Sequence, residues 1–290
     1  MPNDSPWSVL RLLNWTTEFF KEHGNESPRL DAEVLLAESL GCKRIELYTR
    51  FDEVPPEPVR TSFKGLVKKR ADGAPVAYLV GRREFYSLEF AVESGVLIPR
   101  PETELLVVTA LDRIKERGGE PLIADVGTGT GAIAIAVAKH APGAKVVAID
   151  VSPQAVELAK KNAETHGVSD RVAPFESDLF ARVKASRTFD LILSNPPYVT
   201  TNELMGLDET VRDHEPHLAL DGGPDGTTVI ERLLAEAPAR LNDGGELLME
   251  IGPAIAERVE TLVRSAPGLD LVATLKDLAG LPRVTHAVKA

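Results

Sequence analysis

Apolar residues recur three or four positions apart through the first eighty residues of the chain, and this spacing predicts amphipathic α-helices. Each of the three segments ends at a glycine, the residue that most often follows a helix C-terminus, and Pro28 suits the first turn of the second segment. We therefore expect residues 1–80 to form a small helical domain with a core of its own. The segments are 7–24, 27–41 and 56–73.

The pattern changes to an alternation of apolar and polar residues between residues 81 and 100. Alternation with a period of two is typical of a β-strand, and the break near Ser87 predicts a turn between two strands. The sequence therefore predicts a β-hairpin linker over residues 81–100.

From residue 101 to residue 290, short apolar runs alternate with helical patterns. Strand and helix in alternation predict an α/β domain with a mostly parallel sheet and helices on both faces. Six apolar runs have the length and composition of strands. They are residues 122–127, 145–150, 171–176, 191–195, 246–251 and 269–275.

The composition excludes several classes of function for a chain with this predicted fold. The net charge is −11, which argues against a protein that binds nucleic acid stably through many phosphate contacts. Cys42 is the only cysteine, no apolar run is long enough for a membrane span of about 18 residues, and the start lacks the basic region of a signal peptide. We expect a cytoplasmic protein without a metal site or membrane contact, and a monomer by default.

A glycine-rich turn follows the first predicted strand of the α/β domain, and a helical pattern follows the turn. Glycines at such a turn allow unusual backbone angles and close approach of a ligand to the backbone. Asp150, at the end of the next strand, is placed to accept hydrogen bonds from ribose hydroxyls. The pattern indicates a cofactor that contains adenosine, and by itself leaves NAD and S-adenosylmethionine open. The turn residues are Gly127, Thr128, Gly129, Thr130 and Gly131.

Asp178 and Leu179 follow the third predicted strand. The carboxylate of Asp178 could accept a hydrogen bond from the adenine amino group, with Leu179 and Phe180 as walls beside the ring. A solvated aspartate in a loop explains Asp178 equally well.

The fourth strand ends on Asn195-Pro196-Pro197-Tyr198, and the prolines end the strand because they lack an N–H group. In an open parallel sheet, ligands bind beyond the carboxyl ends of the strands where the winding reverses, so this tetrapeptide should face the glycine turn. The Asn195 side-chain carbonyl and the Pro196 backbone carbonyl could hold a planar NH2 group in line with a sulfonium methyl, and Tyr198 could stack on the flat substrate. We expect these four residues to bind the substrate and to carry the catalysis.

These motifs resemble class I methyltransferases that act on planar NH2 groups. Longer stretches, among them "GAPVAYLVGRREFYSLEFAVESGVLIPRPETELLV" and "EPHLALDGGPDG", resemble the peptide chain release factor glutamine methyltransferases, from about Arg29 to Arg283. The resemblance implies a Rossmann-like domain with seven strands and an N-terminal domain that helps to dock a class 1 release factor. The implied reaction methylates the glutamine of the factor's Gly-Gly-Gln motif and converts S-adenosyl-L-methionine to S-adenosyl-L-homocysteine. Arg100, Pro101 and Thr103 match a stretch that lies over the cofactor.

Three positions depart from the pattern of this family. His214 stands where the family usually has tyrosine, Leu179 stands where it often has an aromatic residue, and the glutamine expected shortly after Glu250-Ile251-Gly252 is absent. None of them touches the expected chemistry.

Other classes of function remain as alternatives. An adenine-N6 methyltransferase of DNA or RNA would share the tetrapeptide, but the acidic charge disfavours a nucleic-acid substrate. An NAD enzyme would need an acid or base such as histidine near a strand end, and a cofactor-binding module without catalysis would not need an intact Asn-Pro-Pro-Tyr.

Overall fold

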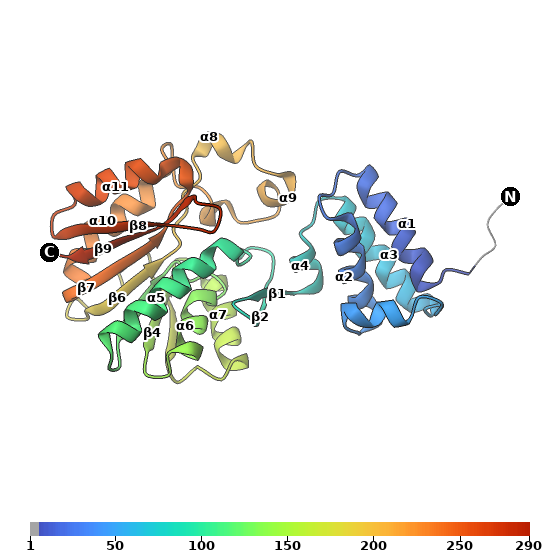
Figure 1. The fold of residues 1–290 in the computed structure, drawn as a ribbon, viewed down its shortest axis with the longest axis horizontal. Helices are drawn as coiled ribbons and strands as arrows, with labels where there is room; N and C mark the ends of the chain where they lie inside the picture. The colour runs from blue at the N-terminus through green and yellow to red at the C-terminus, as the bar shows by residue number, and fades with distance from the viewer. Residues whose placement is uncertain (1–5) are drawn as a thin grey trace. The chain divides into compact units, whose positions relative to one another are not determined.

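The computed structural model describes residues 6–290, which form two compact units (Figure 1). The first unit contains the chain up to Gly81 together with the segment Glu209–His214, and the second contains Arg82–Asp208 and Glu215–Ala290. The sequence pattern places residues 209–214 in the C-terminal domain. In the structure this segment packs with the N-terminal helices, which only tertiary contacts reveal. None of the helices in residues 6–290 is both long and apolar enough to cross a bilayer.

The first unit is helical, as its apolar spacing predicts. Its core contains large side chains that are fully buried, including Phe20, Leu35 and Leu36. Pro28 lies at the start of the second helix, and Gly41 ends that helix in the left-handed conformation (φ 62°). The elements are α1 (Val9–Glu22), α2 (Pro28–Leu40), η1 (Arg44–Thr49), α3 (Glu57–Ala71), α4 (Val76–Val80) and α9 (Glu209–Arg212).

The predicted hairpin consists of β1 (Arg82–Phe85) and β2 (Leu88–Ala91), which pair antiparallel. Tyr86 and Ser87 form its two-residue turn with positive φ angles of 50° and 58°, which match the right-handed twist of the strands. The strands stop at Ala91, so the hairpin is shorter than the predicted span of 81–100. Phe85 and Phe90 are buried in the core of the second unit and attach the hairpin to it.

The second unit is an α/β domain built on one seven-stranded sheet, which confirms the predicted fold. The strand order is β5-β4-β3-β6-β7-β9-β8. The first five strands of this order pair in parallel, and β9 runs antiparallel to both β7 and β8. The strands are β3 (Leu122–Val126), β4 (Lys145–Asp150), β5 (Val172–Glu176), β6 (Phe189–Ser194), β7 (Leu241–Glu250), β8 (Leu269–Lys276) and β9 (Pro282–Lys289).

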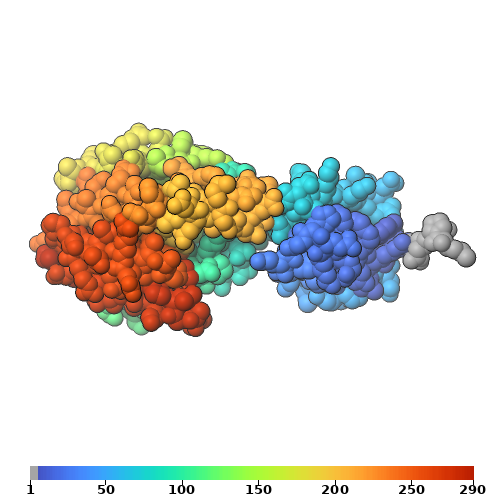
Figure 2. Space-filling view, turned by 90° about the horizontal axis from the view of Figure 1, so that it is seen from above, coloured from blue at the N-terminus to red at the C-terminus, as the bar shows by residue number. Residues whose placement is uncertain are grey.

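Helices cover both faces of the sheet, and each face has its own apolar core (Figure 1). Helices α5, α6 and α7 pack side by side on one face, and α10 and α11 lie on the other. The C-terminal elements, from orange to red, form one continuous surface in Figure 2. The bounds are α5 (Glu104–Arg117), α6 (Ala132–His140), α7 (Pro153–Thr165), α10 (Thr228–Arg240) and α11 (Ala256–Ser265), with short helices η2 (Pro101–Thr103), α8 (Thr201–Leu204), η3 (His217–Ala219) and η4 (Pro253–Ile255).

Candidate active site

A cavity of about 320 Å³ opens where the chain leaves the carboxyl ends of β3 and β6. These two strands are neighbours, and the pair Val126↔Ser194 sets the next residues, Gly127 and Asn195, beside each other. This is the point at which the strand order reverses, as the sequence predicts for a ligand site. The predicted residues that line the cavity are Arg100, Thr103, Gly127, Thr128, Gly129, Thr130, Asp150, Asp178, Leu179, Asn195, Pro196 and Pro197.

Four of the residues predicted at the site, Pro101, Gly131, Phe180 and Tyr198, do not line this cavity. Gly131 instead allows α6 and α7 to pack closely, because a Cβ atom at this position would lie 3.1 Å from the Cβ atom of Ala159. Its φ angle of 82° also disfavours any side chain. Gly131 therefore supports the turn through the packing of α6 against α7 and is not part of the cavity wall.

Asp150 is held by backbone N–H groups on both of its carboxylate oxygens. Gly129 N donates to Oδ2 at 2.8 Å, and Ser152 N donates to Oδ1 at 2.9 Å. Burial raises the pKa of Asp150 above its ordinary value, and these hydrogen bonds oppose that shift. Each oxygen keeps acceptor capacity toward the cavity, so the carboxylate can receive two adjacent hydroxyl groups.

Asp125 lies beneath the glycine turn and is not among the residues that the sequence motifs predict for the site. Its Oδ2 accepts hydrogen bonds from Thr128 Oγ1 at 2.6 Å and from Ala134 N at 3.2 Å. Burial raises the pKa of this carboxyl to about 7. An acid within an otherwise apolar strand, two residues before the first glycine of the turn, is the signal that marks this position.

Asp178 and Leu179 lie at the cavity as predicted, but their neighbours differ from the prediction. Arg232 of α10, which also lines the cavity, donates from Nη2 to Asp178 Oδ2 at 2.8 Å. Phe180 is fully buried and packs against Phe189 in the core, so it does not form a wall of the cavity. The predicted aromatic wall is therefore wrong, because the chain turns this ring inward.

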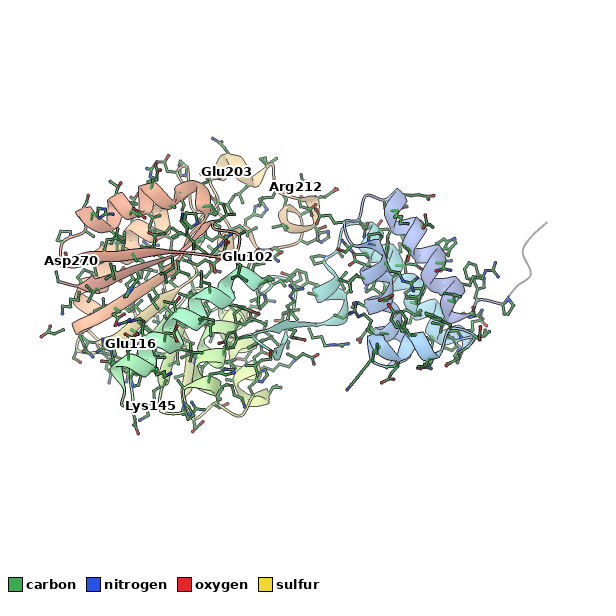
Figure 3. The ribbon with its side chains drawn as sticks, in the orientation of Figure 1. Glu102, Glu116, Lys145, Glu203, Arg212 and Asp270 are labelled. Carbon is green, nitrogen blue, oxygen red and sulfur yellow. The ribbon has the colours of Figure 1, made fainter. Side chains whose placement is uncertain are left out.

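Asn195 reaches the cavity from the end of β6. Its Nδ2 donates to Thr103 Oγ1 at 3.2 Å, and the two prolines that follow line the cavity. Thr103 directly precedes α5, and Figure 3 labels Glu102 just before the start of this helix and Glu116 near its other end. The Glu102 end of α5 therefore lies at the cavity.

Tyr198 does not line the cavity and contacts the end of β7. Its hydroxyl donates to Glu250 Oε1 at 3.3 Å, and its ring leaves no room for a side chain on Gly252, where a Cβ atom would lie 2.9 Å from Cδ2. Burial raises the pKa of Tyr198, so the phenol keeps its proton. The predicted stacking of this ring on a substrate has no counterpart in the cavity wall.

Glu250 is the second acid that the sequence analysis does not assign to the site. It is fully buried at the end of β7, and burial raises its pKa above the ordinary value, although the hydrogen bond from Tyr198 and the charge of Arg283 act in the opposite direction. Like Asp125, it appears in the sequence only as an acid at the end of an apolar strand.

Arg100 is fixed by Glu215, a buried acid from the segment after α9. The Arg100 guanidinium forms an ion pair with Glu215 Oε1, and Ile98 N donates to Glu215 Oε2 at 3.3 Å. His214, one residue earlier, belongs to the first unit, where its ring lies 3.1 Å from the place of a Cβ atom on Gly73. The histidine therefore fills a space within the helical unit.

This cavity has the parts that an S-adenosylmethionine site needs. A volume of about 320 Å³ falls in the range typical of small-molecule sites. Gly129, with a φ angle of 55° and open space around its Cα atom, lets a ligand approach the backbone closely. Asp150 offers carboxylate oxygens and Asn195 offers a polar side chain to the same cavity.

Family models match both parts of the chain. The model of the PrmC N-terminal domain matches residues 11–81, and the model of the methyltransferase small domain matches residues 102–223.

Curated relatives match nearly the whole chain. The release factor glutamine methyltransferase of Rhodopirellula baltica is 52% identical, over 99% of this chain and 98% of the relative. The release factor glutamine methyltransferase of Geobacter sulfurreducens is 42% identical, over 96% of this chain and 95% of the relative.

A solved structure supports the fold. The methyltransferase from Pyrococcus furiosus is 19% identical with a TM-score of 0.52, and the match covers 78% of this chain and 96% of that protein.

Proposed function

The chain belongs to the family of release factor glutamine methyltransferases, and we propose that it methylates the side-chain nitrogen (N5) of the Gly-Gly-Gln glutamine in a class 1 release factor. S-adenosyl-L-methionine is the proposed methyl donor, and S-adenosyl-L-homocysteine is the product. The observation that carries this proposal is the position of Asn195 and Pro196 at the cavity that contains Asp150 and the glycine turn.

The residues of the cavity fit the donor from one end to the other. We assign the ribose hydroxyls to Asp150, the adenine to the region of Leu179 and Asp178, and the remaining part to the turn from Gly127 to Thr130, which Gly131 completes, together with Arg100 and Thr103. When bound, the donor supplies an electrophilic methyl group on a sulfonium sulfur.

Asn195 and Pro196 hold the amide group of the substrate and stabilise its transition state. An amide nitrogen is a weak nucleophile because its lone pair is delocalised, so it must be held in line with the methyl group. The Asn195 side-chain carbonyl and the Pro196 backbone carbonyl accept the two N–H groups of the glutamine. These acceptors also stabilise the positive charge that develops on the nitrogen, and therefore favour the transition state over the ground state.

Catalysis by this arrangement needs neither a strong base nor a metal. The N–C bond would form as the S–C bond of the bound donor breaks, with S-adenosyl-L-homocysteine as the leaving group. The nitrogen is far more acidic once it carries a positive charge and would then release its proton to water. The two prolines limit the backbone freedom of the loop, so little reorganisation precedes the reaction.

The same proposal includes the docking of the release factor, the oligomeric state and the location of the protein. We assign the docking of the release factor to the helical unit, and we expect a monomer that works in the cytoplasm without stable contact to nucleic acid or membrane. An adenine-N6 methyltransferase is the alternative, and the net charge of −11 disfavours it.

Labelled cofactor tests the proposal. Purified enzyme with radiolabelled S-adenosylmethionine should label a wild-type release factor and leave a factor with Gln→Ala in its Gly-Gly-Gln motif unlabelled. Equal labelling of the two factors, or labelling of DNA offered in their place, would overturn the assignment.

A further inference from the structure

A buried side-chain amide connects two separate parts of the cavity wall. Asn162 lies on α7 with only 1% of its surface exposed, and it does not line the cavity itself. Its Oδ1 accepts a hydrogen bond from Ala91 N at 2.9 Å, and its Nδ2 donates to Ala91 O at 3.1 Å. The same Nδ2 donates to Thr130 O at 2.9 Å. One side chain therefore holds both the end of β2 and the glycine turn.

An amide group has the donors and acceptors that these partners need. Its oxygen accepts, and its nitrogen carries two protons to donate. The backbone at Ala91 and Thr130 offers one N–H and two carbonyl oxygens to Asn162, so both protons and the oxygen are used. Exchange of the amide oxygen and nitrogen would direct the oxygen at two carbonyl oxygens, so the partners fix the orientation. An aspartate has the same shape but, when ionised, can only accept.

On one side, Asn162 fixes a peptide group of the glycine turn. The carbonyl oxygen of the peptide between Thr130 and Gly131 accepts from Asn162, and the N–H of the same peptide donates to Thr128 O at 2.8 Å. Both polar groups of this peptide are therefore held. Thr128 and Thr130 line the cavity, so the position of this peptide affects the shape of the wall.

On the other side, Asn162 fixes the start of a segment that passes along the cavity. Ala91 is the last residue of β2, and the segment 92–100 follows it. Gln154, also on α7, donates from Nε2 to Ser94 O at 2.7 Å and holds the same segment further along. The residues of this segment that line the cavity are Gly95, Val96, Leu97, Pro99 and Arg100.

The neighbours of Asn162 on the same face of α7 contact the same two parts of the chain. Ala159 packs against Gly131, where an added Cβ atom would lie 3.1 Å away. The His166 ring hydrogen-bonds through Nε2 to Glu89 O of β2 at 2.9 Å. Residues three and four positions apart share one face of a helix, and Asn162 lies between these two neighbours. It is the member of this group that hydrogen-bonds to both walls.

We propose that Asn162 is a positioning residue that fastens the glycine turn to the segment 92–100 and thereby sets the spacing of these two walls before S-adenosylmethionine binds. This inference rests on the proposed function, because the spacing matters only if the cavity holds this cofactor. Walls that are fixed in advance need little ordering when the ligand binds, so the affinity for the cofactor depends on Asn162. Asn162 acts through backbone groups and does not touch the ligand.

A second asparagine of the same domain offers a matched control. Asn242 lies at the start of β7 and does not line the cavity. Its Nδ2 donates to Asp190 Oδ1 at 2.9 Å, and its Oδ1 accepts from Thr188 Oγ1. Asn162→Asp and Asn242→Asp therefore make the same chemical change, since each keeps the acceptor and loses the donors.

Cofactor binding forms the first part of the test. Asn162→Asp directs a carboxylate oxygen at two carbonyl oxygens, so the two walls should move apart. The Kd for S-adenosylmethionine, measured by calorimetry, should rise about tenfold, which corresponds to about 1.4 kcal/mol. Asn162→Ala, which removes the connection without adding a charge, should show a similar rise, and Asn242→Asp should keep the wild-type Kd. Equal Kd values for the Asn162 variants and Asn242→Asp would overturn the inference.

Steady-state kinetics separate positioning from a general loss of structure. The KM for S-adenosylmethionine should rise with the Kd in both Asn162 variants, whereas kcat at saturating cofactor should stay within about a factor of two. The reason is that Asn195 and Pro196 follow β6, and the hydrogen bonds of Asn162 hold other parts of the wall. A lower kcat with an unchanged KM would contradict the proposed role.

A measurement on the wild-type protein needs no variant to fold. The side-chain 15N–1H signals of Asn162 should move when S-adenosylmethionine is added, because their partner Thr130 lines the cavity, and those of Asn242 should stay in place. Unmoved Asn162 signals would overturn the inference whether or not the enzyme is active. A protein that shows these shifts and the expected Kd values but labels no release factor would overturn the proposed substrate alone.

Discussion

Two side chains at the cavity use only part of their hydrogen-bonding capacity within the protein. Asp150 takes one backbone N–H on each oxygen, and Asn195 gives one N–H to Thr103. The remaining lone pairs belong to groups that are already oriented. Their reorganisation therefore costs little when a ligand binds, which is the condition for strong electrostatic stabilisation.

Removal of the Asn195 side chain should damage the reaction more than the binding of the cofactor. Asn195→Ala deletes one of two oriented acceptors for the amide, so kcat should fall by about two orders of magnitude. The affinity for S-adenosylmethionine, measured by calorimetry, should change by much less. Turnover equal to that of the wild type would contradict the role given to Asn195.

Asp125 should make the stability of the protein depend on pH. Its pKa is about 7 in the folded protein against an ordinary value of 3.8, so between these values the folded state holds a proton that the unfolded chain has released. Stability from this group is therefore present at low pH and lost as the pH rises through about 7.

Asp125→Asn should remove this contribution. Denaturant unfolding of both proteins from about pH 4 to pH 7 should show the wild type losing stability relative to the variant as the pH rises, by as much as about 1.4 kcal/mol per pH unit. A difference that is flat or of opposite slope would show that Asp125 is ionised in the fold.

Among the elements, the loop after β6 depends on a second loop that supports it. Gly226 has a φ angle of 73°, and a Cβ atom on it would lie 2.5 Å from the backbone oxygen of Tyr198. The bridge Val199↔Asp221 and the hydrogen bond from Gly222 N to Val199 O connect the same two segments. The position of Asn195-Pro-Pro-Tyr198 is thus set partly from residues 221–226.

Gly226→Ala should therefore reduce activity through the backbone of this loop. Gly244→Ala is the matched control, because its φ angle is 66° but no atom lies within 4 Å of the added Cβ. Both variants should lose about 1 kcal/mol of stability from the positive φ angle, and Gly226→Ala should lose more, together with kcat. Equal kcat values for the two variants would show that the support is unimportant.

Much of the element pattern could be predicted because local sequence carries it. The helical unit, the hairpin turn at Ser87 and six strands follow from periodicity and turn residues. The resemblance implies a seventh strand, but the apolar pattern does not locate β9, since Pro282–Lys289 gains its strand character from pairing with β7 and β8 on both sides. The sequence also does not predict that Glu209–His214 belongs to the first unit, because this segment packs with residues that are distant from it in the sequence.

Some residues of the candidate site could be predicted from the sequence, and others could not. Glycines at a turn, Asp150 and Asn195 could be found because each follows a strand at a position that the topology makes special. Asp125, Glu215 and Glu250 could not, since their partners lie far away in the sequence and only burial gives them a role. The hydrogen bond of the Tyr198 hydroxyl to Glu250 could not be predicted for the same reason.

At the scale of the whole molecule, the two units have separate apolar cores, and the cavity lies entirely within the second. S-adenosylmethionine should therefore stabilise the second unit in a calorimetric scan, by about 2.7 kcal/mol when its concentration is a hundred times the dissociation constant. The transition of the helical unit should stay where it is. A cofactor that shifts both transitions equally would show that the units unfold as one.

One glutamine side chain of the release factor is proposed to receive the methyl group, and mass spectrometry of the product can locate that group. A release factor incubated with the enzyme and S-adenosylmethionine is digested, and the peptide that contains Gly-Gly-Gln is fragmented. We predict a gain of one methyl group located on that glutamine, present with the wild-type enzyme and nearly absent with Asn195→Ala. An unmodified glutamine, or a methyl group found on another residue of the factor, would contradict the account.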